Sequence, residues 1–81
     1  MHEKINEPVD VLVKFSQNQV LPTFFKWHGR TYKIDKLNLV HNEKSGDDKI
    51  YYFSVSDSLN FFRLAFFTRD LSWRLEEVYC E

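Results

Sequence analysis

Apolar and polar residues alternate with a period of two through most of this chain. From Val9 to Phe15 every second residue is apolar, which places one row of side chains on one face of a strand. A turn is expected at residues 17–19, and a second strand from Thr23 to Trp27. The polar N-terminal stretch, residues 1–7, has no such alternation and is predicted to be a flexible tail.

The dipeptide His28-Gly29 predicts a two-residue hairpin loop, because glycine readily adopts the positive φ that such turns need. In that register the apolar residues on either side of the loop fall on one face, which supports the pairing. The expected pairs are Trp27 with Arg30, Phe25 with Tyr32, and Thr23 with Ile34.

The third strand changes phase part-way along. Tyr32 and Ile34 share one parity, whereas Leu37 and Leu39 have the other. One extra residue near Asp35-Lys36 would restore the inward face, so a β-bulge is predicted there. The polar, glycine-containing stretch 42–49 that follows reads as a loop.

Alternation resumes after that loop and indicates three more strands. One turn is expected at Asp57-Ser58 and another at Arg69-Asp70. The two turns together place a continuous apolar surface across the three strands. The predicted pairs are Phe53 with Phe62, Tyr51 with Leu64, Phe66 with Trp73, and Leu64 with Leu75.

The C-terminal segment fits two secondary structures. Residues 71–79 carry an apolar stripe of helical spacing, but their Trp, Val and Tyr favour a strand. The strand needs a bulge near Glu76-Glu77 to bring Val78 inward. We favour the strand and keep a short helix from about Leu71 to Tyr79 as the alternative.

These patterns predict a single all-β domain over residues 1–81. Its five or six antiparallel strands follow one another in a meander and form a small barrel or a strongly bent sheet. The alternative is the same sheet with the short C-terminal helix. The predicted core consists of Val11, Val13, Phe25, Trp27, Tyr32, Ile34, Leu37, Leu39, Phe53, Val55, Phe62, Leu64, Phe66, Trp73 and Leu75.

Composition narrows the function classes. The chain has 81 residues and a formal net charge of −1, so its overall charge gives no reason to bind polyanions or anionic membranes. Its one cysteine, Cys80, excludes an internal disulfide and suits a cytoplasmic location. The apolar runs are too short to cross a bilayer, and the polar N-terminus is not a signal peptide.

Two stretches resemble a family of small uncharacterised bacterial domains. Residues 22–34 are similar to that family's P-x-x-F-x-W-x-G-R-x-Y-x-V core, and residues 51–79 continue the likeness. The family often has an acidic residue between the Phe and the Leu of the fifth strand, where this chain has Arg63. The resemblance implies a small β fold and no known activity.

Catalytic and metal sites are not expected. His2, His28 and His41 lack metal-ligand spacing, and nothing in the sequence brings a base close to Cys80. The two glycines, Gly29 and Gly46, cannot make a phosphate-binding glycine-rich loop. The sequence therefore predicts a protein that is not an enzyme, has no cofactor and takes no small-molecule substrate.

The aromatic residues exceed what one small core needs. The assigned inward faces leave several aromatic side chains, with Tyr79 among them, on the opposite side near lysine and arginine. The pattern of these residues predicts a surface that binds a protein partner or a second copy of the chain. The alternative is a surface that binds single-stranded nucleic acid, with bases stacked on the aromatic rings and phosphates held by the lysine and arginine side chains. A third interpretation is a core that extends to both faces. The candidate binding residues are Phe24, Lys26, Lys33, Tyr52, Phe61, Arg63 and Phe67.

Overall fold

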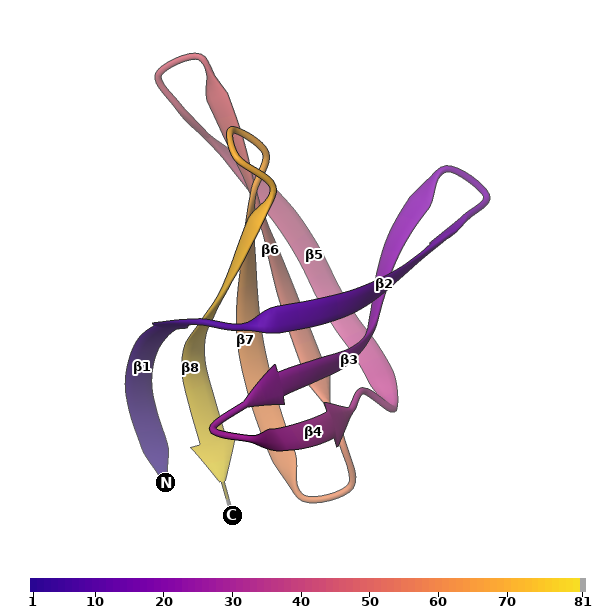
Figure 1. Cartoon of the computed structure of the whole chain (residues 1–81), viewed down its shortest axis with the longest axis vertical. Helices are drawn as coiled ribbons and strands as arrows, with labels where there is room; N and C mark the ends of the chain where they lie inside the picture. Colours follow the sequence, from indigo (N-terminus) through magenta and orange to yellow (C-terminus); the bar gives the residue numbers. More distant parts are fainter. Residues whose placement is uncertain (81) are drawn as a thin grey trace.

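The computed structural model describes residues 1–80, and within them the chain forms eight antiparallel strands and no helix (Figure 1). No helix in this part of the chain is therefore long enough to cross a membrane. The all-β prediction is confirmed, although the strands number eight rather than five or six. The strands are β1 (His2–Pro8), β2 (Asp10–Ser16), β3 (Gln19–Trp27), β4 (Arg30–Lys33), β5 (Lys36–Ser45), β6 (Asp48–Ser56), β7 (Asn60–Phe67) and β8 (Ser72–Cys80).

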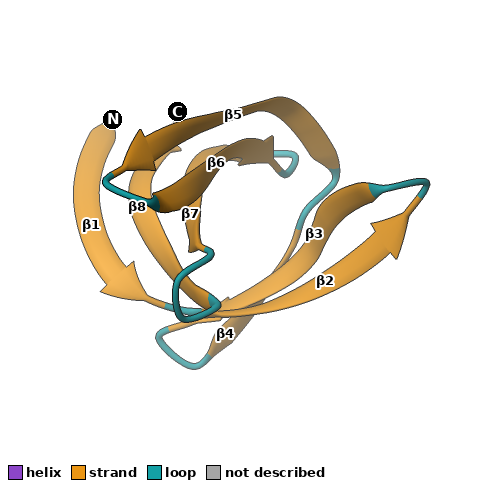
Figure 2. Cartoon of the chain, turned by 90° about the horizontal axis from the view of Figure 1, so that it is seen from above, coloured by secondary structure: helices purple, strands orange, loops and turns teal. Residues whose placement is uncertain are grey.

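Two sheets replace the single meander. Five strands form one sheet in the order β1-β8-β7-β6-β5, and β2-β3-β4 form the other. Figure 2 shows the three-stranded sheet lying across the strongly bent five-stranded sheet. The core between them contains Phe25 from the smaller sheet and Phe53, Val55, Phe62, Leu64, Trp73, Leu75 and Val78 from the larger one.

The hairpins of the smaller sheet follow the predicted chemistry. Both residues of the His28-Gly29 turn have positive φ, 51° and 74°, and the pairing on either side is the one expected. Gln17 and Asn18 make a second tight turn with φ of 50° and 63°. Phe15 continues the alternating row of Val11 and Val13 but is 79% exposed, because it lies near the tip of the β2–β3 hairpin, which projects away from the larger sheet (Figure 1).

The chain passes from one sheet to the other at residues 34–35. The amide of Ile34 donates to the carbonyl of Thr23, and the amide of Asp35 donates to that of Ser56, both at 2.9 Å. The bulge predicted at Asp35-Lys36 is therefore wrong, since the phase change there marks this passage. The register instead shifts between Leu37 and Leu39, and Leu39 is 60% exposed rather than in the core.

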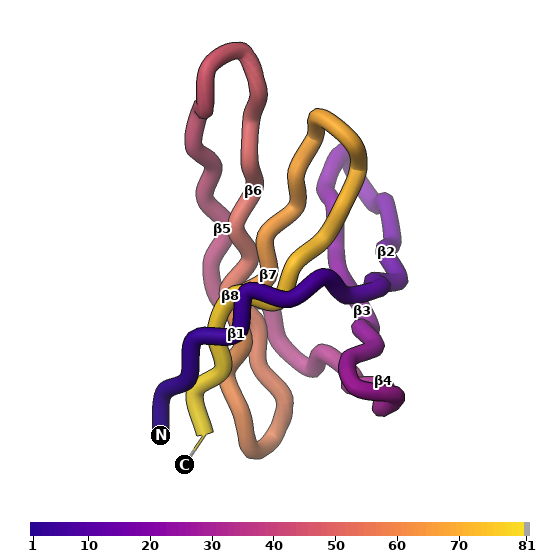
Figure 3. The backbone as a smooth tube through the Cα atoms, turned by 60° about the vertical axis from the view of Figure 1, so that its left-hand side comes forward, coloured from indigo at the N-terminus to yellow at the C-terminus, as the bar shows by residue number. Residues whose placement is uncertain are grey.

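The expected loop over residues 42–49 is also wrong. β5 continues to Ser45, β6 begins at Asp48, and residues 46–47 make a tight turn with Gly46 at φ 64°. This hairpin extends beyond the rest of the molecule (Figure 3). Its outer part has little core to cover, so it carries polar residues on both faces and gives no apolar alternation.

The β6–β7 register differs from the prediction by two residues. Phe53 pairs with Leu64 instead of Phe62. The carboxylate of Asp57 accepts hydrogen bonds from the amides of Leu59 and Asn60, at 2.8 and 2.7 Å, and this lengthens the loop. A shift of two keeps every side chain on its predicted face, because side chains alternate with period two.

The strand assignment of the C-terminus is confirmed. β8 pairs with β7 in the predicted register at Trp73 and Leu75, and the register then shifts at Glu76. That shift brings Val78 into the core, where it is 7% exposed. The helical alternative for residues 71–79 is thereby excluded.

The N-terminal residues form β1, so the prediction of a flexible tail is wrong for residues 2–7. β1 pairs with β8, and the N-terminal amine of Met1 lies against the carbonyl of Cys80 (Figure 3). Ile5 packs against the core. The backbone hydrogen bonds of an edge strand and one inward side chain order a segment that is otherwise polar.

Candidate functional site

The seven sequence-predicted binding residues divide between two outward faces. Phe24 and Lys26 on β3 and Lys33 on β4 belong to the smaller sheet, and the others belong to the larger one. Because the two sheets pack face to face over one core, their outward faces point in opposite directions. The structure therefore does not bring Phe24, Lys26 and Lys33 together with Tyr52, Phe61, Arg63 and Phe67.

The outward face of the smaller sheet is basic and shallow. Phe24 lies directly opposite Lys33, as predicted, and is 37% exposed. Leu12 lies opposite Phe24 on the other side and is 63% exposed. Leu12 and Phe24 border an open hollow of about 320 Å³ that is also lined by Lys26 and Asp10.

The outward face of the larger sheet centres on Arg63. Its guanidinium lies 4.6 Å from the ring centroid of Tyr52, although the two residues are diagonal and not directly opposite. Its Nε also lies 3.2 Å from Glu76 Oε1 as an ion pair, without hydrogen-bond geometry. Burial raises the pKa of Tyr52, and the charges of Glu76 and Glu43 add to that rise. The arginine charge is thus shared with carboxylates from this sheet.

A group of paired side chains, His2, Glu77 and Tyr79, lies beside Phe61 near the chain termini. His2 stacks on Tyr79 with ring centroids 4.2 Å apart, and its Nε2 donates a hydrogen bond to Glu77. This hydrogen bond lowers the pKa of Glu77, while burial and the Glu77 charge raise that of Tyr79. Phe61 is 52% exposed and borders a hollow of about 370 Å³ with Arg63 and Tyr79.

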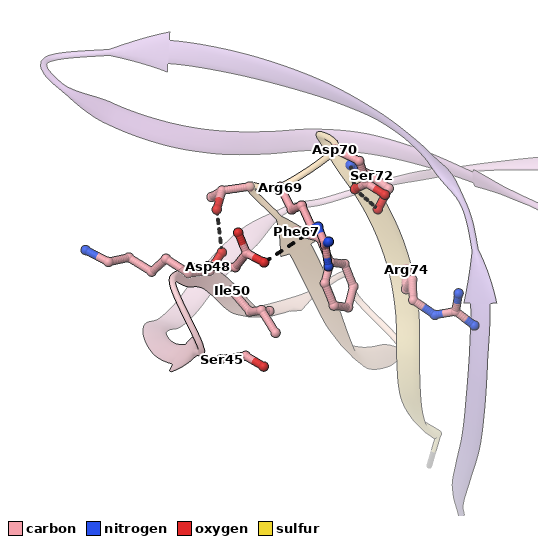
Figure 4. Close-up of a pocket in the computed structure, with 10 residues that line it drawn as sticks. Ser45, Asp48, Ile50, Phe67, Arg69, Asp70, Ser72 and Arg74 are labelled. Carbon is pink, nitrogen blue, oxygen red and sulfur yellow. Dashed lines mark hydrogen bonds and ion pairs between the residues drawn. The ribbon is translucent and has the colours of Figure 1, made fainter.

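Phe67 lies at the opposite end of β7 from Phe61, about 20 Å away at the usual rise per residue. Figure 4 shows it in a hollow between the tips of the β5–β6 and β7–β8 hairpins. Polar groups there pair with one another: Thr68 donates to the carbonyl of Lys49 at 2.6 Å, and Ser72 donates to Asp70 at 2.7 Å. These contacts hold the two hairpins and their turns, so this hollow is structural.

A further hollow lies between the two sheets. Its volume is about 430 Å³, and β3 and β5 border it on opposite sides. Figure 1 shows the β2–β3 hairpin leaning away from the β5–β6 hairpin at this end of the molecule. We call this hollow the inter-sheet cleft; it is lined by Asn18, Gln19, Val20, Leu21, Leu37, Val40, Tyr51, Phe53 and Phe66.

Strand edges without a neighbouring strand border the inter-sheet cleft. Among the described residues, β5 pairs only with β6. β4 pairs with β3 only from Phe24 to Trp27, so residues 19–22 of β3 have a strand neighbour on the β2 side alone. Backbone donors and acceptors on such edges are available to an added strand.

The side chains that line the cleft suit binding and not proton transfer. They are aliphatic or aromatic apart from the amides of Asn18 and Gln19 and the hydroxyl of Tyr51. His41 on β5 is stacked on Tyr52 of the neighbouring strand β6. It lies three strands away from Cys80 on β8, which is roughly 14 Å across the sheet. Within residues 1–80, no three His, Cys, Asp or Glu side chains converge as metal ligands.

The sequence predicted Leu37, Phe53 and Phe66 of the larger sheet as inward-facing, but it did not reveal the β3 residues that line this cleft. These three were predicted as core; Phe53 is 2% exposed in the structure, and Leu37 and Phe66 are half-buried against the same core. Val20 and Leu21 were left unassigned between a turn and a strand. The apolar run Val20-Leu21-Pro22 after the turn was the available signal, since it shows that β3 begins early.

No protein-family model matches the chain, and neither the curated proteins nor the solved structures compared with it give a significant match. The resemblance of residues 22–34 and 51–79 to a family of small bacterial domains therefore stays a prediction.

Proposed function

We propose that this domain is a non-catalytic protein-binding module that accepts an extended polypeptide strand in the inter-sheet cleft. One observation carries the proposal: an apolar hollow lies beside the free edge of β5 and the half-free edge of β3. Adding a strand to an exposed sheet edge is a recurring way to recognise peptides. A cytoplasmic location, suggested by the free thiol of Cys80, is part of the same proposal.

The cleft suggests what such a strand looks like. The added strand would take its main-chain hydrogen bonds from β5, and these do not depend on sequence. Its side chains alternate, so every second one would face Val40, Leu37 and Phe53. Val40 is 42% exposed without a partner and would be covered on binding. We therefore expect preference for segments that are apolar at alternate positions.

Single-stranded nucleic acid is the second candidate, and the smaller sheet supports it best. Phe24 lies opposite Lys33 there, with Lys26 two residues away on the same face. On the larger sheet, the carboxylates of Glu43, Glu76 and Glu77 share the outward side with Arg63 and would repel phosphates. One aromatic residue and two lysines give a small site, so this function ranks second.

A peptide-display selection against the purified domain tests the first proposal. Enriched peptides should be apolar at alternate positions and should bind the wild type but not Val40→Lys. Phe24→Lys serves as the matched control, because it makes the same change on the far face and should leave binding intact. Enrichment that survives Val40→Lys, or the absence of any enrichment, would contradict the proposal.

An oligonucleotide titration followed by amide shifts tests the second candidate. Shifts confined to β3 and β4 that disappear as salt rises would favour nucleic acid at Phe24, since phosphate contacts weaken with salt. Shifts that centre on Val40 and Leu37 would not fit that site. An unchanged spectrum would exclude this function.

A further inference from the structure

The charges along β5 are arranged so that the strand is complementary to itself. An acid and a base, Asp35 and Lys36, precede its apolar centre, and another acid and base, Glu43 and Lys44, follow it. All four side chains are exposed. None of them makes an ion pair within the described residues. We propose that the strand added at this edge is β5 of a second copy, which completes an antiparallel, two-fold symmetric pair.

Side-chain alternation limits how two β5 strands can pair, because opposite residues must lie on the same face. Val40 pairs with Phe53 and Leu37 with Val55, so both point inward, and the register shift between Leu37 and Leu39 makes Asn38 the extra residue. If the two-fold axis passes at Val40, Leu37 then lies opposite Asn42 of the second copy. Faces match along the whole strand in this register.

The same register brings unlike charges together. With Val40 opposite its own copy and Asn38 left out of the pairing as the extra residue, Lys36 lies opposite Glu43 of the second copy. Asp35 follows, and it lies close to Lys44 of the second copy. Symmetry repeats both contacts, so the pair has four attractive contacts around its apolar centre. Opposite charges directly across a sheet stabilise it, and like charges destabilise it.

Neighbouring registers lose this match. A shift of two residues in one direction places Lys36 opposite Ser45 of the second copy. The same shift in the other direction places Lys36 opposite His41, which replaces an attraction by a neutral or repulsive contact. Charge complementarity therefore selects one register, centred on Val40.

The exposed apolar residues of β5 lie at the middle of this pair. Val40 meets its own copy on the inward face, where it borders the inter-sheet cleft. Leu39, 60% exposed, meets His41 of the second copy on the outward face. The inference rests on the proposed function, because the second copy supplies the extended strand expected there.

A charge-swap experiment tests the pair. Sedimentation velocity over a range of protein concentrations should show a dimer that dissociates on dilution. Lys36→Glu and Glu43→Lys should each weaken dimerisation by about tenfold, since each creates two like-charge contacts. The double variant K36E/E43K should return to wild-type association. Within one copy these residues face Ser56 and Ile50, so the rescue cannot come from inside the chain.

Glu3→Lys on β1 is the matched control, because it reverses an exposed charge on the other edge of the same sheet and should leave the dimer unchanged. A wild type that stays monomeric at every concentration, or a double variant no better than the single ones, would overturn the second copy as occupant. If that monomer still selected peptides sensitive to Val40→Lys, the proposed function would stand. If it selected none, both would fall.

Discussion

The two edge strands of the larger sheet differ in how they meet the solvent. β1 is short and charged, has a register shift between Lys4 and Glu7, and ends at Pro8. β5 has ten residues, no proline, and exposed Leu39 and Val40 at its centre. Natural sheets protect their edges with charges, irregular register and proline. β1 has all three features, whereas β5 has charged residues only toward its ends, one register shift near its start and no proline.

Side chains strengthen this difference. At one end of β1, His2 donates to Glu77, and at the other end Glu7 accepts hydrogen bonds from Trp27 at 3.1 Å and from His28 at 2.9 Å. On β5 the amide of Asn38 donates to Ser56 near the start of the strand. One edge of the sheet is thus fastened to its surroundings, and the other is left available to a partner strand.

The largest expected effect concerns the core that both edges share. Trp73 is 8% exposed and packs against Phe53 and Phe66, with ring centroids 5.3 and 4.8 Å apart. Trp73→Ala should lower the free energy of unfolding by about 3–5 kcal/mol. Urea denaturation measures this loss. A loss below about 1 kcal/mol would show that the side chain is not part of a packed core.

A matched pair of truncations compares the edges directly. Ile5 on β1 packs against the core, so Ile5→Ala should cost about 1–2 kcal/mol. Leu39→Ala on β5 should change stability by less than about 0.5 kcal/mol in the monomer at low concentration. Equal losses in urea denaturation would contradict the difference between a fastened and an open edge.

A stabilising substitution is available at the turn between β7 and β8, away from both edges. Leu71 has φ of 61° and is 72% exposed, so its side chain contributes little packing in a conformation that disfavours it. Leu71→Gly should raise stability by about 0.5–1 kcal/mol. A lower melting temperature would mean that the leucine makes contacts that outweigh this strain.

The smallest effect is the pH dependence of the β1 contacts. Hydrogen bonds from Trp27 and then His28 lower the pKa of Glu7, and one from His2 lowers that of Glu77. The unfolded chain therefore takes up these protons at higher pH than the folded one. Their stabilisation is present above about pH 4.3 and is lost as pH falls toward the lowered values. As pH is lowered through this range, the urea midpoint of the double variant Glu7→Gln/Glu77→Gln should fall less than that of the wild type. An equal fall in both proteins would show that these two carboxylates do not cause the pH dependence.

The sequence predicted the parts of the fold where one face is buried. The β3–β4 and β7–β8 registers and the bulge at Glu76 are confirmed, because apolar alternation and tight-turn residues agreed there. β1 and the outer part of β5 were missed, since they have no continuous buried face and so no periodic signal. The loop after Asp57 is longer than predicted, because its carboxylate accepts hydrogen bonds from the amides of Leu59 and Asn60. Apolar alternation does not reveal such side-chain hydrogen bonds.

The candidate site was harder to predict for a different reason. Alternation separates inward from outward residues, but it does not tell which sheet a strand joins. The passage at Ile34–Asp35 sends β4 and β5 into different sheets, and this divides Phe24, Lys26 and Lys33 from Tyr52 and Arg63. It also opens the cleft between β3 and β5. This cleft depends on contacts between residues that lie far apart in the sequence, which alternation does not predict.

The two tryptophans occupy different places and provide two built-in fluorescence probes. Trp73 lies in the core. Trp27 lies on the smaller sheet, and its indole N–H donates a hydrogen bond to the carboxylate of Glu7 on the larger sheet. Emission from Trp27 should respond when the sheets separate at β1, and emission from Trp73 only when the core is lost. A Trp27→Phe variant would resolve the two signals and so show whether the sheets part before the domain unfolds.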